Sequence, residues 1–205
     1  MRISPSSAPS IEVLVSVPED NQPSSSYSFK PNIVGAFTDV LSDAWYAEPV
    51  KWAVDKSITN GTSATTFSPD NTCTRAQILT FLWRAVGSPQ MTGANPFSDV
   101  NATDYYYNAA LWASSKGMIS GTTFGPNTPC TRAETVIYLW KNAGCPAADQ
   151  VNQFLDITNI NSELGKAVSW AFMNSITGGT AAHSFSPDMT CTRGQIVTFL
   201  YRALK

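Results

Sequence analysis

The sequence is poor in the residues that most enzymes need. It contains one histidine, His183, in 205 residues, so a histidine-based catalytic triad, a multi-histidine metal site or a histidine proton relay is not expected. No carboxylate pair has a spacing that suggests glycosidase chemistry, and no glycine motif for phosphate binding is present. The composition therefore predicts a non-catalytic protein that needs no cofactor and no metal.

Charge and long apolar runs are also scarce. Charged residues make up 14% of the chain, and the formal net charge is −2. A broad nucleic-acid surface needs clustered positive charge, so this balance argues against a nucleic-acid partner. No run approaches the roughly 20 apolar residues of a membrane-spanning helix, which predicts no membrane insertion. The N-terminus lacks the apolar core of a signal peptide, so the signal of a secreted protein would lie outside this sequence.

The first 36 residues differ in composition from the rest. Serine and proline fill 14 of these positions, a composition that buries little apolar surface. We therefore predict that residues 1–36 are a linker or the tail of an upstream domain. The apolar run IEVLVSV at 11–17 has strand-like β-branched content, and it could be the last strand of that domain or pack on the repeats that come after it.

From Phe37 onward the chain repeats itself three times. FTDV (37–40), FSDV (97–100) and FLDI (154–157) begin the copies, and a tryptophan follows each aspartate by 13, 13 and 14 residues. A glycine follows each tryptophan by 9 residues, and a Cys-Thr-Arg segment comes later in each copy. Repeats of this kind indicate a tandem architecture with one structural unit per copy. The predicted repeats are residues 37–92, 93–150 and 151–205.

Each copy is predicted to fold as helix, loop, helix. The first helices are expected near 48–57, 105–116 and 162–175, each containing the repeated tryptophan. The second helices begin with Thr-x-x-Glu/Gln capping boxes, in which side chain and backbone satisfy each other's hydrogen bonds. They are apolar on nearly every side, which is typical of buried helices. We therefore expect a mainly α fold, with the second helices as a central three-helix bundle of pseudo-threefold symmetry.

These motifs together resemble the S-layer homology domain. The resemblance rests on F-x-D-V, the tryptophan-bearing helix, F-x-P and above all the TRAQ and TRAE segments, matched three times over residues 37–205. It implies a pseudo-trimer that anchors an extracellular protein to the bacterial cell wall or S-layer. The implied partner is a secondary cell-wall polysaccharide or peptidoglycan-linked glycan, typically with a pyruvate ketal, and the implied state is a monomer. In that family the arginine of the TRAE motif lies in the ligand groove between repeats.

An arginine stands at the first position of every second helix, at Arg75, Arg132 and Arg193. A cation there opposes the positive end of the helix dipole, which costs a few tenths of a kcal/mol. In one interpretation the guanidinium, the helix N-terminus and loop amides jointly bind a carboxylate. In the other, each arginine pairs with a nearby acid, such as Asp70, Asp188 or the aspartate of the next F-x-D motif.

Exposed aromatic side chains could add contacts to a sugar ring. Trp45 aligns with Tyr105, and either could stack on a pyranose or pack within its own repeat. The third repeat has Glu163 at this position and also CTRGQ in place of CTRAQ or CTRAE, so a third sugar site is in doubt. Trp52, Trp112 and Trp170 are expected to lie in the core.

Four further residues have two possible roles. Asp39 and Asp99 could hold a loop or accept hydrogen bonds from sugar hydroxyls. Gly61 and Gly121 could supply a positive φ or let the backbone approach a sugar closely.

A cysteine precedes the capping threonine of every second helix. We expect these three residues to serve as small hydrophobic side chains rather than as a metal cluster, and all four cysteines of the chain to be free thiols.

Two other functions remain open at this stage. The repeats could form a protein-interaction or self-assembly module, in which the arginines take part in structural ion pairs. An enzyme acting on wall glycans is disfavoured by the small number of catalytic groups.

Overall fold

The computed structural model describes residues 34–151 and 153–205. Over these ranges the chain forms six helices and no β-strand, only isolated bridges, so the predicted mainly α fold is confirmed. The apolar run at 11–17 and nearly all of the linker predicted over 1–36 lie outside the described residues. Within the described residues, no helix is long and apolar enough to cross a membrane.

The helices alternate between two kinds along the chain. The tryptophan-bearing helices are α1 (Ala47–Asp55), α3 (Tyr107–Ser115) and α5 (Glu163–Met173). The helices that follow a Cys-Thr-Arg segment are α2 (Arg75–Ala85), α4 (Arg132–Asn142) and α6 (Arg193–Leu204). The predicted boundaries of the first kind differ from these by one or two residues at each end.

The predicted capping boxes are present at α2, α4 and α6. In α4, the Thr131 hydroxyl accepts from the Glu134 amide at 3.2 Å, and the Glu134 carboxylate accepts from the Thr131 amide at 3.0 Å. In α2 and α6 the third helical residue is a glutamine, and its side-chain amide oxygen accepts the bond that the Glu134 carboxylate accepts in α4. Gly87 and Gly144 follow the ends of α2 and α4 with φ of +92° and +85°, as expected for a helix C-terminus.

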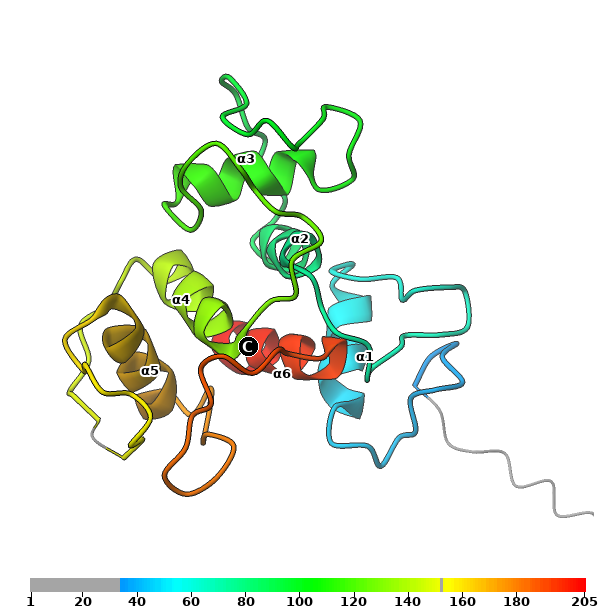
Figure 1. The fold of residues 1–205 in the computed structure, drawn as a ribbon. Coiled ribbons are helices and arrows are strands. Elements are labelled where there is room, and N and C mark those ends of the chain that lie inside the picture. Colours follow the sequence, from blue (N-terminus) through cyan, green and yellow to red (C-terminus); the bar gives the residue numbers. More distant parts are fainter. Residues whose placement is uncertain (1–33, 152) are drawn as a thin grey trace, which may run out of the picture. The chain divides into compact units, whose positions relative to one another are not determined.

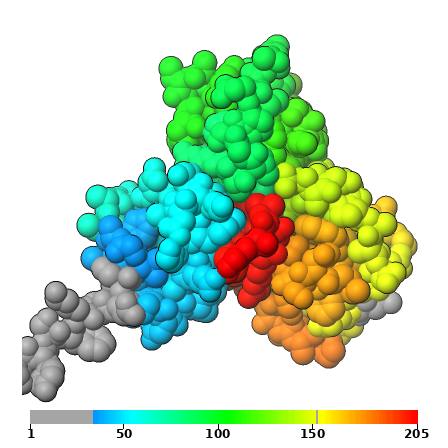
Figure 2. Space-filling view, turned by 180° about the vertical axis from the view of Figure 1, so that it is seen from behind, coloured from blue at the N-terminus to red at the C-terminus, as the bar shows by residue number. Residues whose placement is uncertain are grey.

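The two helices of one repeat do not form the main packing pair; each outer helix packs instead on the central helix of a neighbouring repeat. The helices α2, α4 and α6 contact one another, whereas α3 packs on α2, α5 on α4 and α1 on α6 (Figure 1). Each outer helix therefore packs on the central helix of the preceding repeat, and the first repeat closes the cycle onto the last. Figure 2 shows the red surface of α6 between atoms of the first and third repeats. The arrangement is consistent with the predicted pseudo-threefold symmetry.

The Cys-Thr-Arg cysteines lie where the three repeats meet. The Cys73 amide donates to the Cys191 carbonyl, the Cys191 amide to the Cys130 carbonyl and the Cys130 amide to the Cys73 carbonyl, each at 2.9 Å. This closed ring of hydrogen bonds joins the chain segments just before the three central helices. All three side chains are fully buried. The prediction of four free thiols is confirmed, since none of the cysteines forms a disulfide.

The thiols should differ sharply in reactivity. Burial raises the pKa of Cys73 to about 12 and also raises the pKa values of Cys130 and Cys191, so these thiols stay protonated near neutral pH. Cys145 is exposed. We expect a thiol reagent to modify one cysteine rapidly in the native protein and the other three only on unfolding. Rapid labelling of three or four thiols, measured by mass spectrometry of the intact chain, would contradict the buried ring.

The hydrophobic core follows the repeated aromatic residues. The phenylalanines of the F-x-P loops, Phe67, Phe124 and Phe185, are fully buried. Trp112 and Trp170 are buried as predicted. Trp52 is only partly buried and packs edge-on against the Tyr201 ring of α6.

Candidate functional site

The N-termini of the central helices are held by the loop of the following repeat. At α4, the Arg132 amide donates to the Met189 carbonyl and the Ala133 amide to the Pro187 carbonyl, both at 2.9 Å. The same pattern recurs at α2 and α6. These amides already have protein acceptors, so the structure does not support the expectation that they join the arginine in binding an anion.

The arginine side chains reach the same loops. Arg132 Nε donates to the Phe185 carbonyl at 2.8 Å, and Arg193 Nε donates to the Phe67 carbonyl at 2.9 Å. Each guanidinium thus lies between its own repeat and the next one in the cycle. Three cyclically related arginine clusters result, and their surroundings differ in charge.

Arg132 is a buried cation that has no acidic partner among the described residues. It is 5% exposed, and its guanidinium carbon lies 4.9 Å and 5.3 Å from the ring centres of Phe185 and Phe199. Its Nη2 donates to the Thr177 hydroxyl at 3.4 Å. Within the described part of the chain, no carboxylate forms a salt bridge with it. Burial lowers the pKa of Arg132, which means that its surroundings disfavour its charge.

An accessible pocket of about 180 Å³ opens beside Arg132 and is built by all three repeats. Trp45 from the first repeat lines it although 61% of this residue is exposed. The third repeat supplies the remaining lining residues, which are Ile176, Thr177, Gly178, Gly179, Gln195, Thr198, Phe199 and Arg202. A cationic floor next to an exposed indole can hold an anionic ligand that has an apolar face.

The guanidinium of Arg193 has aromatic surroundings like those of Arg132. Arg193 is 3% exposed, and its guanidinium lies over the rings of Phe67 and Phe81. Its Nη2 and the Thr80 hydroxyl are buried and find no hydrogen-bond partner among the described residues. Two such polar atoms leave this cluster with hydrogen-bonding capacity that the described chain does not use.

Tyr105 belongs to the Arg193 cluster as Trp45 belongs to the Arg132 pocket. Tyr105 occupies the repeat position of Trp45, and burial raises the pKa of its phenol. Like Trp45, Tyr105 is 61% exposed.

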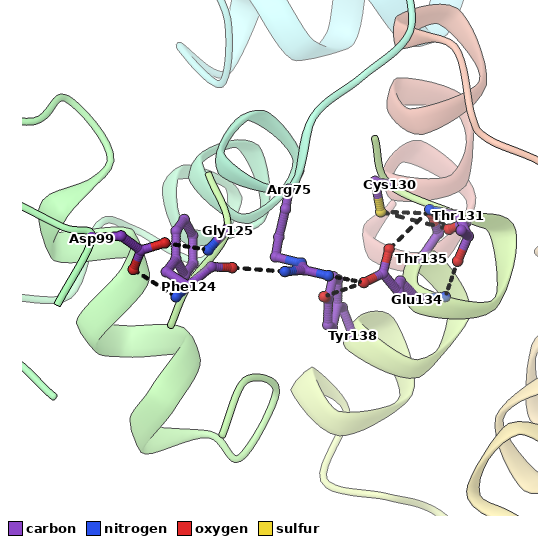
Figure 3. Close-up of polar contacts among 9 residues, drawn as sticks. All are labelled: Arg75, Asp99, Phe124, Gly125, Cys130, Thr131, Glu134, Thr135 and Tyr138. Carbon is purple, nitrogen blue, oxygen red and sulfur yellow. Dashed lines mark hydrogen bonds and ion pairs between the residues drawn. The ribbon is translucent and has the colours of Figure 1, made fainter. Parts of the chain in front are cut away.

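The Arg75 cluster is different because it contains its own anion. Arg75 Nη1 donates to the Phe124 carbonyl at 2.7 Å, and Nη2 forms an ion pair with Glu134 at 2.6 Å (Figure 3). The Tyr138 hydroxyl donates to the same carboxylate oxygen at 3.4 Å. Burial lowers the pKa of Arg75, but the bond to Glu134, the charge of Glu134 and the nearby Tyr138 together outweigh it, and the net shift is upward. Here the ion-pair interpretation holds, with a glutamate in place of the aspartates expected from the sequence.

Asp39 and Asp99 have the contacts of loop-holding residues. The Asp39 carboxylate accepts from the amides of Phe67 and Ser68 at 2.8 and 2.7 Å. The Asp99 carboxylate accepts from the equivalent amides of its own repeat, those of Phe124 and Gly125, both at 2.7 Å. Burial raises the pKa of Asp99, but these bonds outweigh it and hold the pKa below its usual value. Each aspartate thus fixes the F-x-P loop whose phenylalanine carbonyl receives an arginine.

Gly61 and Gly121 both have a positive φ, of +83° and +89°. A Cβ at Gly61 would lie 2.4 Å from the Thr66 carbonyl oxygen, whereas one at Gly121 would meet nothing within 4 Å. The local backbone conformation therefore accounts for both glycines, and close packing accounts for Gly61 in addition.

Sequence reasoning missed most of the Arg132 pocket, including its two long polar side chains from α6, Gln195 and Arg202. A comparison of the repeats contains the signal for them, because a basic residue follows each arginine of interest by nine positions, at Arg84, Lys141 and Arg202. The third position of each central helix carries either glutamine or glutamate. Neither pattern shows by itself that these side chains face the arginine of the preceding repeat.

The fold and its arginine clusters define a module of three interlocking helix–loop–helix repeats. The S-layer homology domain family matches residues 36–79, 96–136 and 153–197, which together are more than half of the sequence. The chain belongs to this family, and the predicted family resemblance is confirmed. Its relatives include cell-surface proteins, and this membership indicates association with the cell surface or cell wall.

Relatives of this chain include enzymes and surface proteins. The chain is 28% identical to an endoglucanase of Bacillus sp. (strain KSM-635) over 78% of its own length and 18% of that protein. It is 27% identical to an amylopullulanase of Thermoanaerobacterium thermosulfurigenes, over 82% of its length and 9% of the enzyme. It is 24% identical to a surface-layer 125 kDa protein of Lysinibacillus sphaericus, over 77% of its length and 14% of that protein. The chain therefore spans less than a fifth of each of these relatives.

Proposed function

We propose that this chain is a non-catalytic anchor that binds an anionic cell-wall polysaccharide at Arg132 and Arg193. The observation that carries the proposal is the Arg132 pocket, where a buried guanidinium that forms no salt bridge within residues 34–151 and 153–205 lies beside an exposed indole. A buried cation without a counter-charge is costly, and an anionic ligand would supply that charge. The residues 1–36 would then connect the three repeats, 37–92, 93–150 and 151–205, to an upstream domain.

A carboxylate held rigidly on a sugar ring fits the chemistry of the pocket. The guanidinium fork of Arg132 matches the geometry of a carboxylate, and Arg202 adds a second positive charge. The Trp45 face suits the apolar C–H face of a pyranose, while Gln195 offers an amide to sugar hydroxyls. A pyruvate ketal presents its carboxylate in this rigid way, and we propose it as the recognised group.

The pocket is equipped for binding rather than for turnover. Its lining residues, all from the described part of the chain, include no aspartate, glutamate, histidine or cysteine. Hydrolysis of a glycosidic bond needs a proton donor and a base or nucleophile, usually two carboxylates. This supports an anchoring role, in which the second site at Arg193 adds avidity for a polymer that repeats the recognised sugar.

Removal of the two exposed rings tests the proposal. In the Trp45→Ala/Tyr105→Ala variant we expect wall binding to fall by about fivefold to a hundredfold, because each ring contributes roughly 0.5–1.5 kcal/mol of contact. Stability should change little, since both residues are largely exposed. The measurement is co-sedimentation with purified cell walls, before and after chemical removal of the wall polysaccharide.

Leu155→Ala is the matched control, because Leu155 is an exposed apolar residue, at 76%, that does not line the Arg132 pocket. It should bind walls like the unchanged chain. Undiminished sedimentation of the double variant would contradict the proposal. Binding that survives removal of the polysaccharide would instead favour a protein-interaction module.

A further inference from the structure

The three arginine clusters differ at one position that decides their charge. The third residue of the central helix facing each arginine is Gln195 for Arg132, Glu134 for Arg75 and, by its position in the repeat, Gln77 for Arg193. Capping does not require the negative charge, because Gln77 and Gln195 accept from their N-cap amides at 3.2 and 3.0 Å. The second oxygen of Glu134 is the one that binds Arg75.

A second acid stands where the other clusters have an aromatic ring. Glu163 takes the sequence position of Trp45 and Tyr105, and it forms an ion pair with Lys141 at 2.7 Å. Lys141 in turn takes the position of Arg202 and Arg84. Both cations of the Arg75 cluster are therefore neutralised by carboxylates of the chain itself.

The pose of Arg75 is adapted to this internal ion pair. Arg132 and Arg193 use Nε to reach a phenylalanine carbonyl, whereas Arg75 uses Nη1, and its buried Nε has no partner among the described residues. The loop beside it contains Gly125, where a Cβ would lie 2.7 Å from Arg75 Nη1. The other two loops have serine at this position. Three sequence differences, at 125, 134 and 163, thus act in the same direction.

We propose that Glu134 and Glu163 close the Arg75 cluster to anionic ligands, so that this chain offers two anion-binding sites rather than three. Glu134 occupies the coordination position that a ligand carboxylate takes at the other arginines, and it does so at an effective concentration that a free ligand cannot match. This inference rests on the proposed function for the two open sites. In this proposal, the residue at the third position of each central helix determines whether the arginine that it faces can bind an anion.

The test compares the unchanged chain with Glu134→Gln/Gly125→Ser, which installs residues that the other repeats already use. The probe is a synthetic pyruvylated amino sugar, and its unpyruvylated counterpart serves as the blank. In side-chain NMR of the arginine Nε–H groups, the resonances of Arg132 and Arg193 should shift on titration while that of Arg75 stays in place. In the double variant the Arg75 resonance should shift as well, and calorimetric stoichiometry should rise from two towards three.

Glu48→Gln is the matched control, since it also removes one carboxylate from an ion pair, the exposed pair with Lys205. It should leave the stoichiometry at two. A shift of Arg75 in the unchanged chain at the same probe concentrations as Arg132 would overturn the closure. The closure would also be overturned if the Arg75 resonance did not shift in the double variant while the resonances of the other two arginines did.

A readout without ligand separates this inference from the proposed function. The ion pair should slow rotation of the Arg75 guanidinium about its Nε–Cζ bond in the unchanged chain, and Glu134→Gln should release it. If no arginine responds to the probe but this difference is seen, the proposed function fails and the internal ion pair stands. Equally free rotation in both proteins would overturn the closure whatever the probe does.

Discussion

Replacing Arg132 by methionine is expected to weaken ligand binding in its pocket by at least about tenfold and to leave the stability of the protein almost unchanged. Arg75→Met should instead lower the stability and leave binding at the Arg132 pocket unchanged. Both arginines begin a central helix and both reach a loop carbonyl of the next repeat. They differ in charge environment, because burial lowers the pKa of Arg132 while the Glu134 bond leaves the pKa of Arg75 raised. The folded chain thus disfavours one cation and favours the other.

The sizes of the expected effects follow from this difference. Replacing a buried charge that lacks a counter-ion with an apolar side chain of similar volume is often neutral or stabilising. For Arg132→Met we expect this gain to offset the lost bond to the Phe185 carbonyl, with a net change in unfolding free energy below about 1 kcal/mol. Arg75→Met leaves the Glu134 carboxylate without its cation, which costs about 1–3 kcal/mol. Affinity at the Arg132 pocket should fall by at least about tenfold with the loss of a charge-assisted contact.

Urea unfolding and titration with the pyruvylated sugar measure the two quantities on the same samples. Arg132→Lys keeps a charge but lacks the planar fork, so it should retain only part of the affinity. The account would be wrong if Arg75→Met lost affinity as strongly as Arg132→Met. A loss of several kcal/mol of stability in Arg132→Met would show that this arginine is mainly structural.

The fold could be predicted from the sequence because its main signals are local and occur three times. The capping boxes mark where the second helices begin, and Gly87 and Gly144 mark where two of them end. The apolar composition of these helices indicates that they are buried. Such signals depend on neighbouring residues, and three copies in register make them unambiguous. The ring of backbone hydrogen bonds at the Cys-Thr-Arg segments could not be predicted, since it depends on how the repeats meet in space.

The arginines of the candidate site could be found from the sequence for the same local reason. The residues from other repeats that surround each arginine could not. Every cluster combines an arginine from one repeat, a central helix from the next and a residue at the start of the outer helix, or just before it, from the third, as in Arg132, Gln195 and Trp45. The missing aromatic ring of the third repeat, at Glu163, therefore affects the Arg75 cluster and not the Arg193 cluster of its own repeat. If each repeat is treated as an independent site, the missing aromatic ring is assigned to Arg193, although it belongs to the cluster of Arg75.

Gly61 and Gly121 have a similar backbone conformation, so an alanine substitution at Gly121 serves as the control for the same substitution at Gly61. Gly61→Ala is expected to destabilise the chain by about 2–5 kcal/mol, and Gly121→Ala by only about 1–2 kcal/mol. Both substitutions place an L side chain at a similar positive φ, which costs about 1–2 kcal/mol. Only the first also forces a Cβ within 2.4 Å of the Thr66 carbonyl and 2.5 Å of the Phe37 ring. That overlap adds the cost of overpacking, typically 1–3 kcal/mol.

The difference should extend to binding because of what Gly61 holds in place. The Gly61 amide donates to the Thr59 hydroxyl, just as the Gly179 amide donates to Thr177, whose hydroxyl accepts from Arg132. Displacing Gly61 thus disturbs the loop that faces Arg193. Gly121 instead precedes Phe124, whose carbonyl accepts from Arg75, the arginine that already pairs with Glu134. Urea unfolding and sugar titration of both variants check this. Equal losses of stability would show that backbone conformation alone, and not packing against Phe37, selects glycine at position 61.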